Sequence, residues 1–361
     1  MGAEFQFKLE RLENCPICGF EAEEKPDFIL HDFFSDDLSA NINWYASICR
    51  VCKSYFLNPR PTVDTVLHAY KDYYTHTVTS DAVIKHQSSI RKAIARHIRD
   101  TYVKCKLSHE VYLWDILIGT LAFLSPKRRL ITDIGIRYAA RFLSRPFKAR
   151  VLDIGAGSGD YLNTLQKYGW QCYAVEPDMR CGVHSLLPSA NIFPSIDSLG
   201  AELESAFDLI TLSHTLEHLH DPVGAIKKCN FLLKTSGRIW IDIPNPNSSL
   251  ASIFGEFWRG FEAPRHLILF EKNYLLGLLK ALGFDNINCI SRPDVFDFME
   301  RRSREIMNST MSEMRKQEKS HKQLPNIRSK IEKIDRSSEF LTIVAEKSFN
   351  YLVSCKDKPI R

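Results

Sequence analysis

A glycine-rich turn between an apolar strand and a helix constrains the fold of this chain more than any other feature. The segment reads Val151-Leu-Asp-Ile-Gly-Ala-Gly-Ser-Gly-Asp-Tyr161. Glycines at such a turn let the backbone bend sharply and approach a ligand closely. Glu176 ends the next predicted strand, 21 residues after Gly155. An acid at that place can accept hydrogen bonds from both hydroxyls of a ribose. The turn therefore predicts a site for a ligand that contains a ribose.

The spacing and charge of the turn narrow the class of ligand. The glycines follow G-x-G-x-G and not the G-x-G-x-x-G of dinucleotide-binding proteins, and Asp160 follows the last of them. An acid at the start of the helix would repel a pyrophosphate, but it suits a cationic sulfonium with an amino-acid group. Asp153 lies inside the apolar strand, where a buried carboxylate needs a partner. A tight turn without a ligand is the alternative, and Asp153 argues against it.

Strand and helix patterns alternate from Arg150 onward. The predicted strands are Arg150–Ile154, Gln171–Glu176, Asn191–Ser195, Phe207–Leu212, Arg238–Ile243, a strand near Asn286–Ser291, and Glu339–Ala345. Helical patterns at Asp160–Tyr168, Pro222–Leu233 and Lys272–Leu282 separate several of them. This alternation predicts a parallel sheet with helices on its faces.

The segment from Arg150 to Lys347 resembles the class I S-adenosylmethionine (SAM)-dependent methyltransferases, and more narrowly those of type 11/23. The glycine turn carries the resemblance, together with Phe207–Pro222, Leu232–Pro244 and Pro264-Arg-His-Leu. The resemblance implies an α/β fold with a Rossmann-like sheet of seven strands in the order 3-2-1-4-5-7-6. A long polar and helical insertion at about 295–336 departs from the family pattern.

The resemblance also implies which residues hold SAM. In the family, the D-x-G-x-G-x-G positions contact the methionine part, and the acid after strand two holds the ribose. Here the expected cofactor-binding residues are Asp153, Gly155, Gly157, Gly159, Glu176, Asp197 near the adenine, and Ser213 at the end of strand four.

Histidines after strand four are the candidate catalytic groups. The enzyme mainly aligns donor and acceptor in methyl transfer, and it sometimes removes a proton. Histidine titrates near neutrality, so His218 and His266 are the expected general bases, with a packing role as the alternative for each. Strand four ends in Ser213-His-Thr-Leu-Glu-His218 and not in Asn/Asp-Pro-Pro-Tyr, and no Pro-Cys nucleophile occurs there. This disfavours methylation of nucleobase amines and of pyrimidine carbon 5, and favours methylation at oxygen or carbon of another acceptor.

Four cysteines near the N-terminus predict a zinc site. Cys15 and Cys18 form one C-x-x-C pair, and Cys49 and Cys52 form a second. Two such pairs can supply four thiolates to one tetrahedral ion, and a site filled by four cysteines is structural. A zinc ribbon that stabilises a small unit is expected, with unpaired thiols as the alternative.

These features divide the chain into a zinc-binding module at 1–75, a basic helical segment at 76–147 and a SAM-binding domain at 148–361. Between Asp81 and Arg150 there are fifteen Lys or Arg residues against five Asp or Glu residues. Ile90, Ile94, Ile98 and Tyr102 follow a helical spacing, as do Arg137, Arg141 and Arg145. The basic stripe Lys92, Arg96 and Arg99 hints at an anionic partner, although exposed charge is often only solvated.

Three functions stay open from the sequence. The preferred one is methylation of a small-molecule or glycan-linked (nucleotide-sugar-linked) acceptor that is anionic. The alternatives are an RNA methyltransferase with a zinc module and a SAM-binding protein without activity. The start of the chain lacks an apolar signal core, so a cytoplasmic protein is expected. The apolar run from Val111 to Leu124 is too short to span a bilayer and is interpreted as a buried helix.

Overall fold

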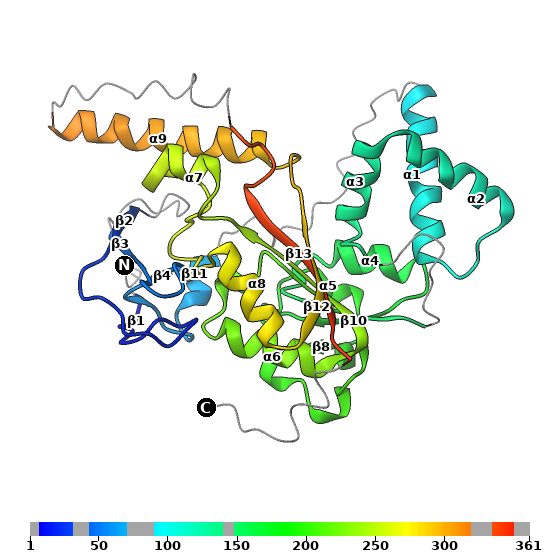
Figure 1. Ribbon diagram of the computed structural model, residues 1–361, viewed down its shortest axis with the longest axis horizontal. Helices are drawn as coiled ribbons and strands as arrows, with labels where there is room; N and C mark the ends of the chain where they lie inside the picture. Colours follow the sequence, from blue (N-terminus) through cyan, green and yellow to red (C-terminus); the bar gives the residue numbers. More distant parts are fainter. Residues whose placement is uncertain (1–6, 32–42, 71–89, 140–147, 319–333, 350–361) are drawn as a thin grey trace.

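The computed structural model describes residues 7–31, 43–70, 90–139, 148–318 and 334–349 (Figure 1). Its centre is a seven-stranded sheet in the order β12-β13-β10-β9-β6-β7-β8. In chain order the strands are β6 (Arg150–Ile154), β7 (Gln171–Val175), β8 (Ile192–Phe193), β9 (Phe207–Ser213), β10 (Leu233–Pro244), β12 (Phe284–Ile290) and β13 (Phe340–Lys347). Only β13 runs antiparallel to its neighbours. This is the order 3-2-1-4-5-7-6 read from the other edge, so the predicted fold class is confirmed.

Helices connect these strands and cover the sheet. They are α4 (Asp160–Gln166), α5 (Val183–Leu186), α6 (Pro222–Leu232), α7 (Ser249–Phe254) and α8 (Lys272–Ala281), with 3-10 turns η4 (Ser189–Asn191), η5 (Ile196–Ser198), η6 (Ala201–Leu203), η7 (Leu216–His218) and η8 (Gly255–Phe257). The sequence specifies the start of α6, where the Gly224 amide donates to the Asp221 side chain at 2.8 Å and Pro222 takes the first helical position. The inner strands β6, β9 and β13 are largely buried, as expected of a sheet covered on both faces, whereas the edge strand β12 is mostly exposed.

The N-terminal segment forms a second sheet, which a strand from the segment after residue 148 completes. The elements of the N-terminal segment are β1 (Leu9–Glu10), β2 (Phe28–His31), β3 (Asn43–Ile48), β4 (Tyr55–Leu57), β5 (Arg60–Pro61) and η1 (Val66–Tyr70). β1 and β5 pair with each other in a small sheet of their own. β11 (Ile268–Leu269) pairs antiparallel with β4, which gives the order β11-β4-β3-β2. One continuous hydrophobic core contains residues of both segments, such as Trp44 and Phe270. The boundary at residue 75 therefore separates segments of sequence that share one core.

Residues 90–135 form a helical unit beside the main sheet, at the right of Figure 1. It contains α1 (Ile90–Leu107), α2 (Leu113–Thr120), η3 (Leu121–Leu124) and α3 (Pro126–Gly135). Val103 and Leu107 of α1 pack with Leu162 and Leu165 of α4 in a second core. The Trp170 indole also donates to the Leu107 carbonyl at 3.2 Å. The unit is thus anchored to the sheet by the C-terminal half of α1.

Two helical predictions for this unit are wrong. Arg137 does not begin a further helix, because it follows the end of α3 with a φ of 49° and turns back toward the sheet; Arg141 and Arg145 lie outside the described residues. The run Val111–Leu124 is helical but not buried. Its side chains Leu113, Trp114 and Leu124 are exposed, because α1 covers only a narrow strip of the run.

The predicted insertion begins with a long helix, α9 (Phe296–Glu318), which contacts α7 and η8 near the N-terminal sheet (Figure 1). Residues 319–333 of the insertion lie outside the described part. Among the described residues, no helix is both long enough and apolar enough to cross a membrane.

Candidate functional site

The three glycines of the turn are required for different reasons. All three have positive φ angles, 76° at Gly155, 52° at Gly157 and 78° at Gly159. A Cβ atom on Gly155 would lie 2.5 Å from the Thr215 hydroxyl, and one on Gly159 would lie 3.1 Å from the Val183 backbone. A Cβ atom on Gly157 would meet no atom within 4 Å. Gly155 and Gly159 therefore allow close packing, whereas Gly157 borders open space beside the turn, where a ligand could approach the backbone.

Glu176 holds the glycine turn from the end of β7. Its Oε2 accepts a hydrogen bond from the Gly157 amide at 2.8 Å, and its Oε1 accepts one from the Asp178 amide at 3.0 Å. The side chain is nearly buried. The structure thus brings Glu176 and the turn together as the sequence predicted, and its contact with a ribose stays a prediction.

Asp153 is buried beneath the turn and has a protein partner. It forms an ion pair with Arg137, and the Thr211 hydroxyl donates to it at 2.5 Å. Burial raises the pKa of Asp153, although the Arg137 guanidinium opposes the shift. Arg137 also donates to Thr211 at 2.8 Å and lies 3.9 Å from the centre of the Tyr161 ring. The sequence showed that Asp153 needs a partner, but it offered no signal that identified Arg137.

The remaining expected cofactor residues lie at the same edge of the sheet. Ser213 ends β9 and is half-buried, and its carbonyl accepts a hydrogen bond from the Thr215 hydroxyl at 3.2 Å. Asp197 lies in η5 after β8 and is exposed. Their contacts with a cofactor stay predictions.

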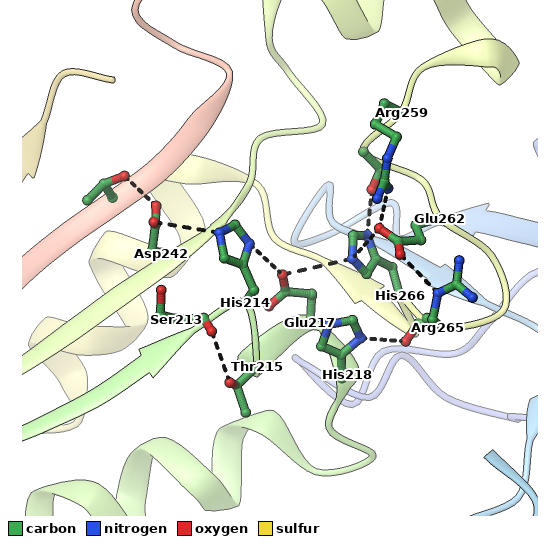
Figure 2. A network of polar contacts seen from close by, with 12 residues as sticks. Ser213, His214, Thr215, Glu217, His218, Asp242, Arg259, Glu262, Arg265 and His266 are labelled. Carbon is green, nitrogen blue, oxygen red and sulfur yellow. Dashed lines mark hydrogen bonds and ion pairs between the residues drawn. The ribbon is translucent and has the colours of Figure 1, made fainter. Parts of the chain in front are cut away.

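A network of histidines and carboxylates lies beyond the ends of β9 and β10 (Figure 2). We call it the histidine–carboxylate network; it comprises His214, Glu217, His218, Asp242, Glu262 and His266. Oε1 of Glu217 lies 3.8 Å from Nδ1 of His214 and 4.0 Å from Nε2 of His266. Glu217 is fully buried, and neither of its carboxylate oxygens has a hydrogen-bond partner among the described residues. The network therefore brings together His218 and His266, the two histidines that the sequence singled out, and it places a buried carboxylate between His214 and His266.

His218 is oriented by two neighbours. Its Nδ1 lies 2.8 Å from the Arg265 carbonyl and 2.8 Å from the Tyr70 hydroxyl. With Nδ1 engaged in this way, Nε2 is the ring nitrogen left to take up a proton. Tyr70 belongs to η1 of the N-terminal segment, so that segment contributes directly to the site.

His266 is held as a neutral imidazole. Its Nδ1 lies 2.6 Å from the Gly260 carbonyl. Because a carbonyl can only accept, Nδ1 carries a hydrogen and donates this hydrogen bond. Burial lowers the pKa of His266 to about 4, although Glu262 pulls the pKa in the opposite direction. For Glu217, burial favours the neutral form, but His214, His218 and His266 outweigh it and lower the pKa. The site therefore combines a neutral imidazole with an ionised carboxylate.

Two arginines fix Glu262 next to His266. Arg259 forms an ion pair with Glu262, and Nε of Arg265 donates to it at 2.9 Å. Burial would raise the pKa of Glu262, but His266 and the two arginines lower it. Arg265 also donates to the Ala69 carbonyl at 3.1 Å, which ties this loop to η1. Glu262 and Arg265 thus hold the loop that carries His266.

The four N-terminal cysteines converge on one point. The Sγ atoms of Cys15 and Cys52 are 3.6 Å apart, and those of Cys18 and Cys49 are 3.4 Å apart. All four lie within 4.8 Å of one another. Tetrahedral ligands at about 2.3 Å from zinc would be about 3.8 Å apart, so the four thiols fit this ion. Each pair lies in a tight turn, closed by hydrogen bonds from Gly19 to Cys15 and from Lys53 to Cys49.

A second set of possible ligand atoms lies in the network itself. Glu217, His218 and His266 each offer one atom within 4.8 Å of the others. Chemically, this arrangement can accept a proton from a bound acceptor, stabilise the positive charge that results, or hold a cation.

Comparison with known proteins finds similarity to methyltransferases over the same part of the chain. A family model described as a methyltransferase domain matches residues 124–288. The chain is 31% identical over 122 residues to the ubiquinone biosynthesis O-methyltransferase of Xanthomonas campestris pv. campestris (strain B100), which is 32% of this chain and 51% of that protein. The corresponding protein of Xanthomonas axonopodis pv. citri (strain 306) is 33% identical over the same shares. The chain thus spans about half the length of the curated relatives it matches.

Solved structures include similar chains. The YcgJ protein of Bacillus subtilis aligns with 62% of this chain and 99% of its own, at 18% identity and a TM-score of 0.42. The 1,6-didemethyltoxoflavin-N1-methyltransferase of Burkholderia thailandensis, solved with its acceptor and S-adenosylhomocysteine, aligns with 73% of this chain and 93% of its own, at 15% identity and a TM-score of 0.37.

Proposed function

From the match of a methyltransferase-domain model to residues 124–288, we propose that the protein transfers a methyl group from SAM to a hydroxyl group of a small-molecule or glycan-linked acceptor. The observation that carries the proposal is the pairing of the glycine turn with the histidine–carboxylate network at the same edge of the sheet.

SAM would bind against the glycine turn. Gly157 leaves the backbone open to a ligand, and Glu176 lies at the end of the neighbouring strand, where the ribose hydroxyls would reach it. In the free protein the Gly157 amide already holds this carboxylate. Asp153 would act below the turn, as the anchor that fixes Arg137 and the strand end.

His218 would be the general base. Its Nδ1 is oriented by Arg265 and Tyr70, so Nε2 can take the proton of an acceptor hydroxyl as the oxygen attacks the methyl group of SAM in line. The oxygen forms its bond to the methyl carbon while the bond from carbon to sulfur breaks, and S-adenosylhomocysteine leaves. The ionised Glu217 carboxylate would stabilise the imidazolium formed on His218. His266 would stay neutral and would position the acceptor.

A hydroxyl acceptor is supported by the curated relatives, which are named as O-methyltransferases. Attack from an acceptor carbon would need the same base. The exposed stripe Lys92, Arg96 and Arg99 supports an anionic group on the acceptor. We further propose that Cys15, Cys18, Cys49 and Cys52 hold one structural zinc ion. This ion would supply no chemistry to the transfer.

Calorimetric titration with S-adenosylhomocysteine tests the cofactor part of the proposal. We expect micromolar binding of one molecule per chain and no binding of NAD. The Glu176→Gln variant should bind about tenfold to a hundredfold more weakly, because it loses a charged hydrogen-bond acceptor. Wild-type protein that is folded and ignores S-adenosylhomocysteine would contradict the proposal. Screening hydroxylated small molecules, nucleotide sugars and RNA with labelled SAM then identifies the acceptor.

A further inference from the structure

The helical unit exposes an apolar face that ordinary surface packing does not explain. We call it the α2–η3 face; it consists of Leu113, Trp114, Leu117, Leu121 and Leu124. Trp114 is 74% exposed, Leu113 70% and Leu124 81%. The spacing of these residues places them on one side of the continuous helix from α2 into η3. Large apolar side chains gathered in this way mark a binding surface more often than isolated exposed ones do.

The opposite side of the same helix is firmly held. Asp115 forms an ion pair with Lys104 of α1 at 2.7 Å, and its backbone carbonyl accepts from the Cys105 thiol at 3.2 Å. Gly119 is buried against the neighbouring helices. Because these contacts fix the rotation of α2, the apolar side chains are directed outward by the fold itself. The helix α2 lies at the outer edge of the unit, away from the main sheet (Figure 1).

Positive charge borders the α2–η3 face. Lys127 and Arg128 are exposed in the first turn of α3, which begins two residues after Leu124, and Arg129 lies 4.6 Å from the centre of the Phe123 ring. The first turn of α3 contains no acid. Basic side chains at a helix N-terminus are unfavourable, because the helix dipole is positive there. An external anion at this place would relieve that cost.

We propose that the α2–η3 face rests on the surface of an anionic lipid bilayer. Leucine and tryptophan side chains would enter the boundary between headgroups and acyl chains, while Lys127, Arg128 and Arg129 would contact lipid phosphates. The helix would lie in the plane of the surface, because it is far too short to span the bilayer. A second copy of the chain is a less suitable occupant, since a symmetric pair would bring two sets of these basic residues together.

Co-sedimentation of the full-length protein with lipid vesicles tests this proposal. One set of vesicles contains phosphatidylcholine alone, and the other contains phosphatidylcholine with phosphatidylglycerol. We expect binding to the anionic vesicles, weaker binding to the neutral ones, and release at high salt. Trp114→Ser combined with Leu117→Ser should weaken binding to the anionic vesicles by about tenfold or more. Lys127→Gln combined with Arg128→Gln should remove the preference for anionic lipid.

A matched control keeps the experiment decisive. Val63 is an exposed apolar residue of the N-terminal segment, 67% accessible, and Val63→Ser should bind vesicles like the wild type. Affinity for S-adenosylhomocysteine shows that each variant is folded, because none of these residues lies in the proposed SAM site. The proposal fails if the wild type binds neither set of vesicles, or if the Trp114 and Leu117 variant binds as well as the wild type. It also fails if light scattering shows a dimer that this variant dissociates and vesicle binding is absent.

Discussion

At the scale of single residues, the site is defined by where each titratable group finds its partner. His218 and His266 lie in the same network, with ring centres 4.8 Å apart, yet their surroundings differ. The Arg265 carbonyl and the Tyr70 hydroxyl orient His218, whereas His266 is buried with a pKa of about 4. This difference in environment supports the proposed roles, proton transfer for His218 and positioning for His266.

The His218→Asn variant tests that assignment. An asparagine amide can still donate to the Arg265 carbonyl, but it cannot accept a proton. We expect kcat with a hydroxyl acceptor to fall by about a hundredfold or more, while the affinity for S-adenosylhomocysteine stays unchanged. His97→Asn, an exposed histidine on α1, serves as the control and should leave kcat unaltered. If His218→Asn kept full activity, His218 would be a packing residue.

Burial of neutral His266 also makes stability depend on pH. Its pKa is lowered from 6.5 to about 4 by burial, so between these values the unfolded chain binds more protons than the folded one. The free energy of unfolding should therefore fall as pH drops from 6.5 toward 4, by up to about 2–3 kcal/mol from this residue. Glu217 and Glu262 have lowered pKa values, so each contributes to the free energy of unfolding an amount that is lost as the pH falls below 4.5.

Urea denaturation between pH 4 and pH 8 measures this dependence. His266→Asn keeps a donor for the Gly260 carbonyl but cannot titrate, so its stability should change less between pH 6.5 and 4. His214 has a raised pKa, because Glu217 and Asp242 outweigh the effect of burial. His214 therefore contributes stability that is lost as the pH rises above 6.5. To separate the effect of His266 from that of His214, the free energy of unfolding is compared as a function of pH only below 6.5. Equal slopes for the two proteins in this window would show that His266 is already protonated in the fold.

At the scale of elements, the sequence predicted most of the main sheet, but little of how the N-terminal sheet and the helical unit pack around it. The positions of the strands followed from the apolar runs in the sequence, and their order followed from the resemblance to the methyltransferases. β11 could not be predicted, because a strand of two residues has no pattern, and its partner β4 is more than 200 residues away. The exposure of the run Val111–Leu124 was also beyond the sequence, since an apolar helix does not reveal how much of it a neighbour covers.

The turn after α3 depends on one buried ion pair. Arg137→Met should leave the Asp153 carboxylate buried without its cation, which costs about 3–5 kcal/mol of unfolding free energy. Adding Asp153→Leu should recover much of that loss, because the buried charge is removed as well. Arg99→Met, on an exposed arginine of α1, is the control and should change stability little. Urea unfolding measures all of these variants, and an Arg137→Met protein as stable as the wild type would mean that water satisfies Asp153.

At the scale of the whole molecule, the N-terminal segment contributes to the proposed acceptor side of the site. β4 pairs with β11, and β11 follows His266 by only two residues. η1 supplies Tyr70 to His218 and the Ala69 carbonyl to Arg265. The glycine turn, by contrast, depends on contacts within the main sheet, such as those with Glu176 and Thr215. The structure of the acceptor side therefore depends on the N-terminal segment, and the SAM side depends on it much less.

Removal of zinc should separate these two sides. We expect one zinc ion per chain by metal analysis, bound by Cys15, Cys18, Cys49 and Cys52. In Cys15→Ser combined with Cys18→Ser, the metal should be lost and the N-terminal sheet should loosen, because the ion's binding energy contributes to folding. Binding of S-adenosylhomocysteine should persist with little change, while methyl transfer falls at least as far as in His218→Asn. Serine at Cys289, an exposed cysteine outside the cluster, should alter neither property. If the variant without the two cysteines kept full activity, the N-terminal segment would hold His218 and His266 in place without the metal. If the variant lost S-adenosylhomocysteine binding as well as activity, the shared core would join the two sides of the site into one cooperative unit.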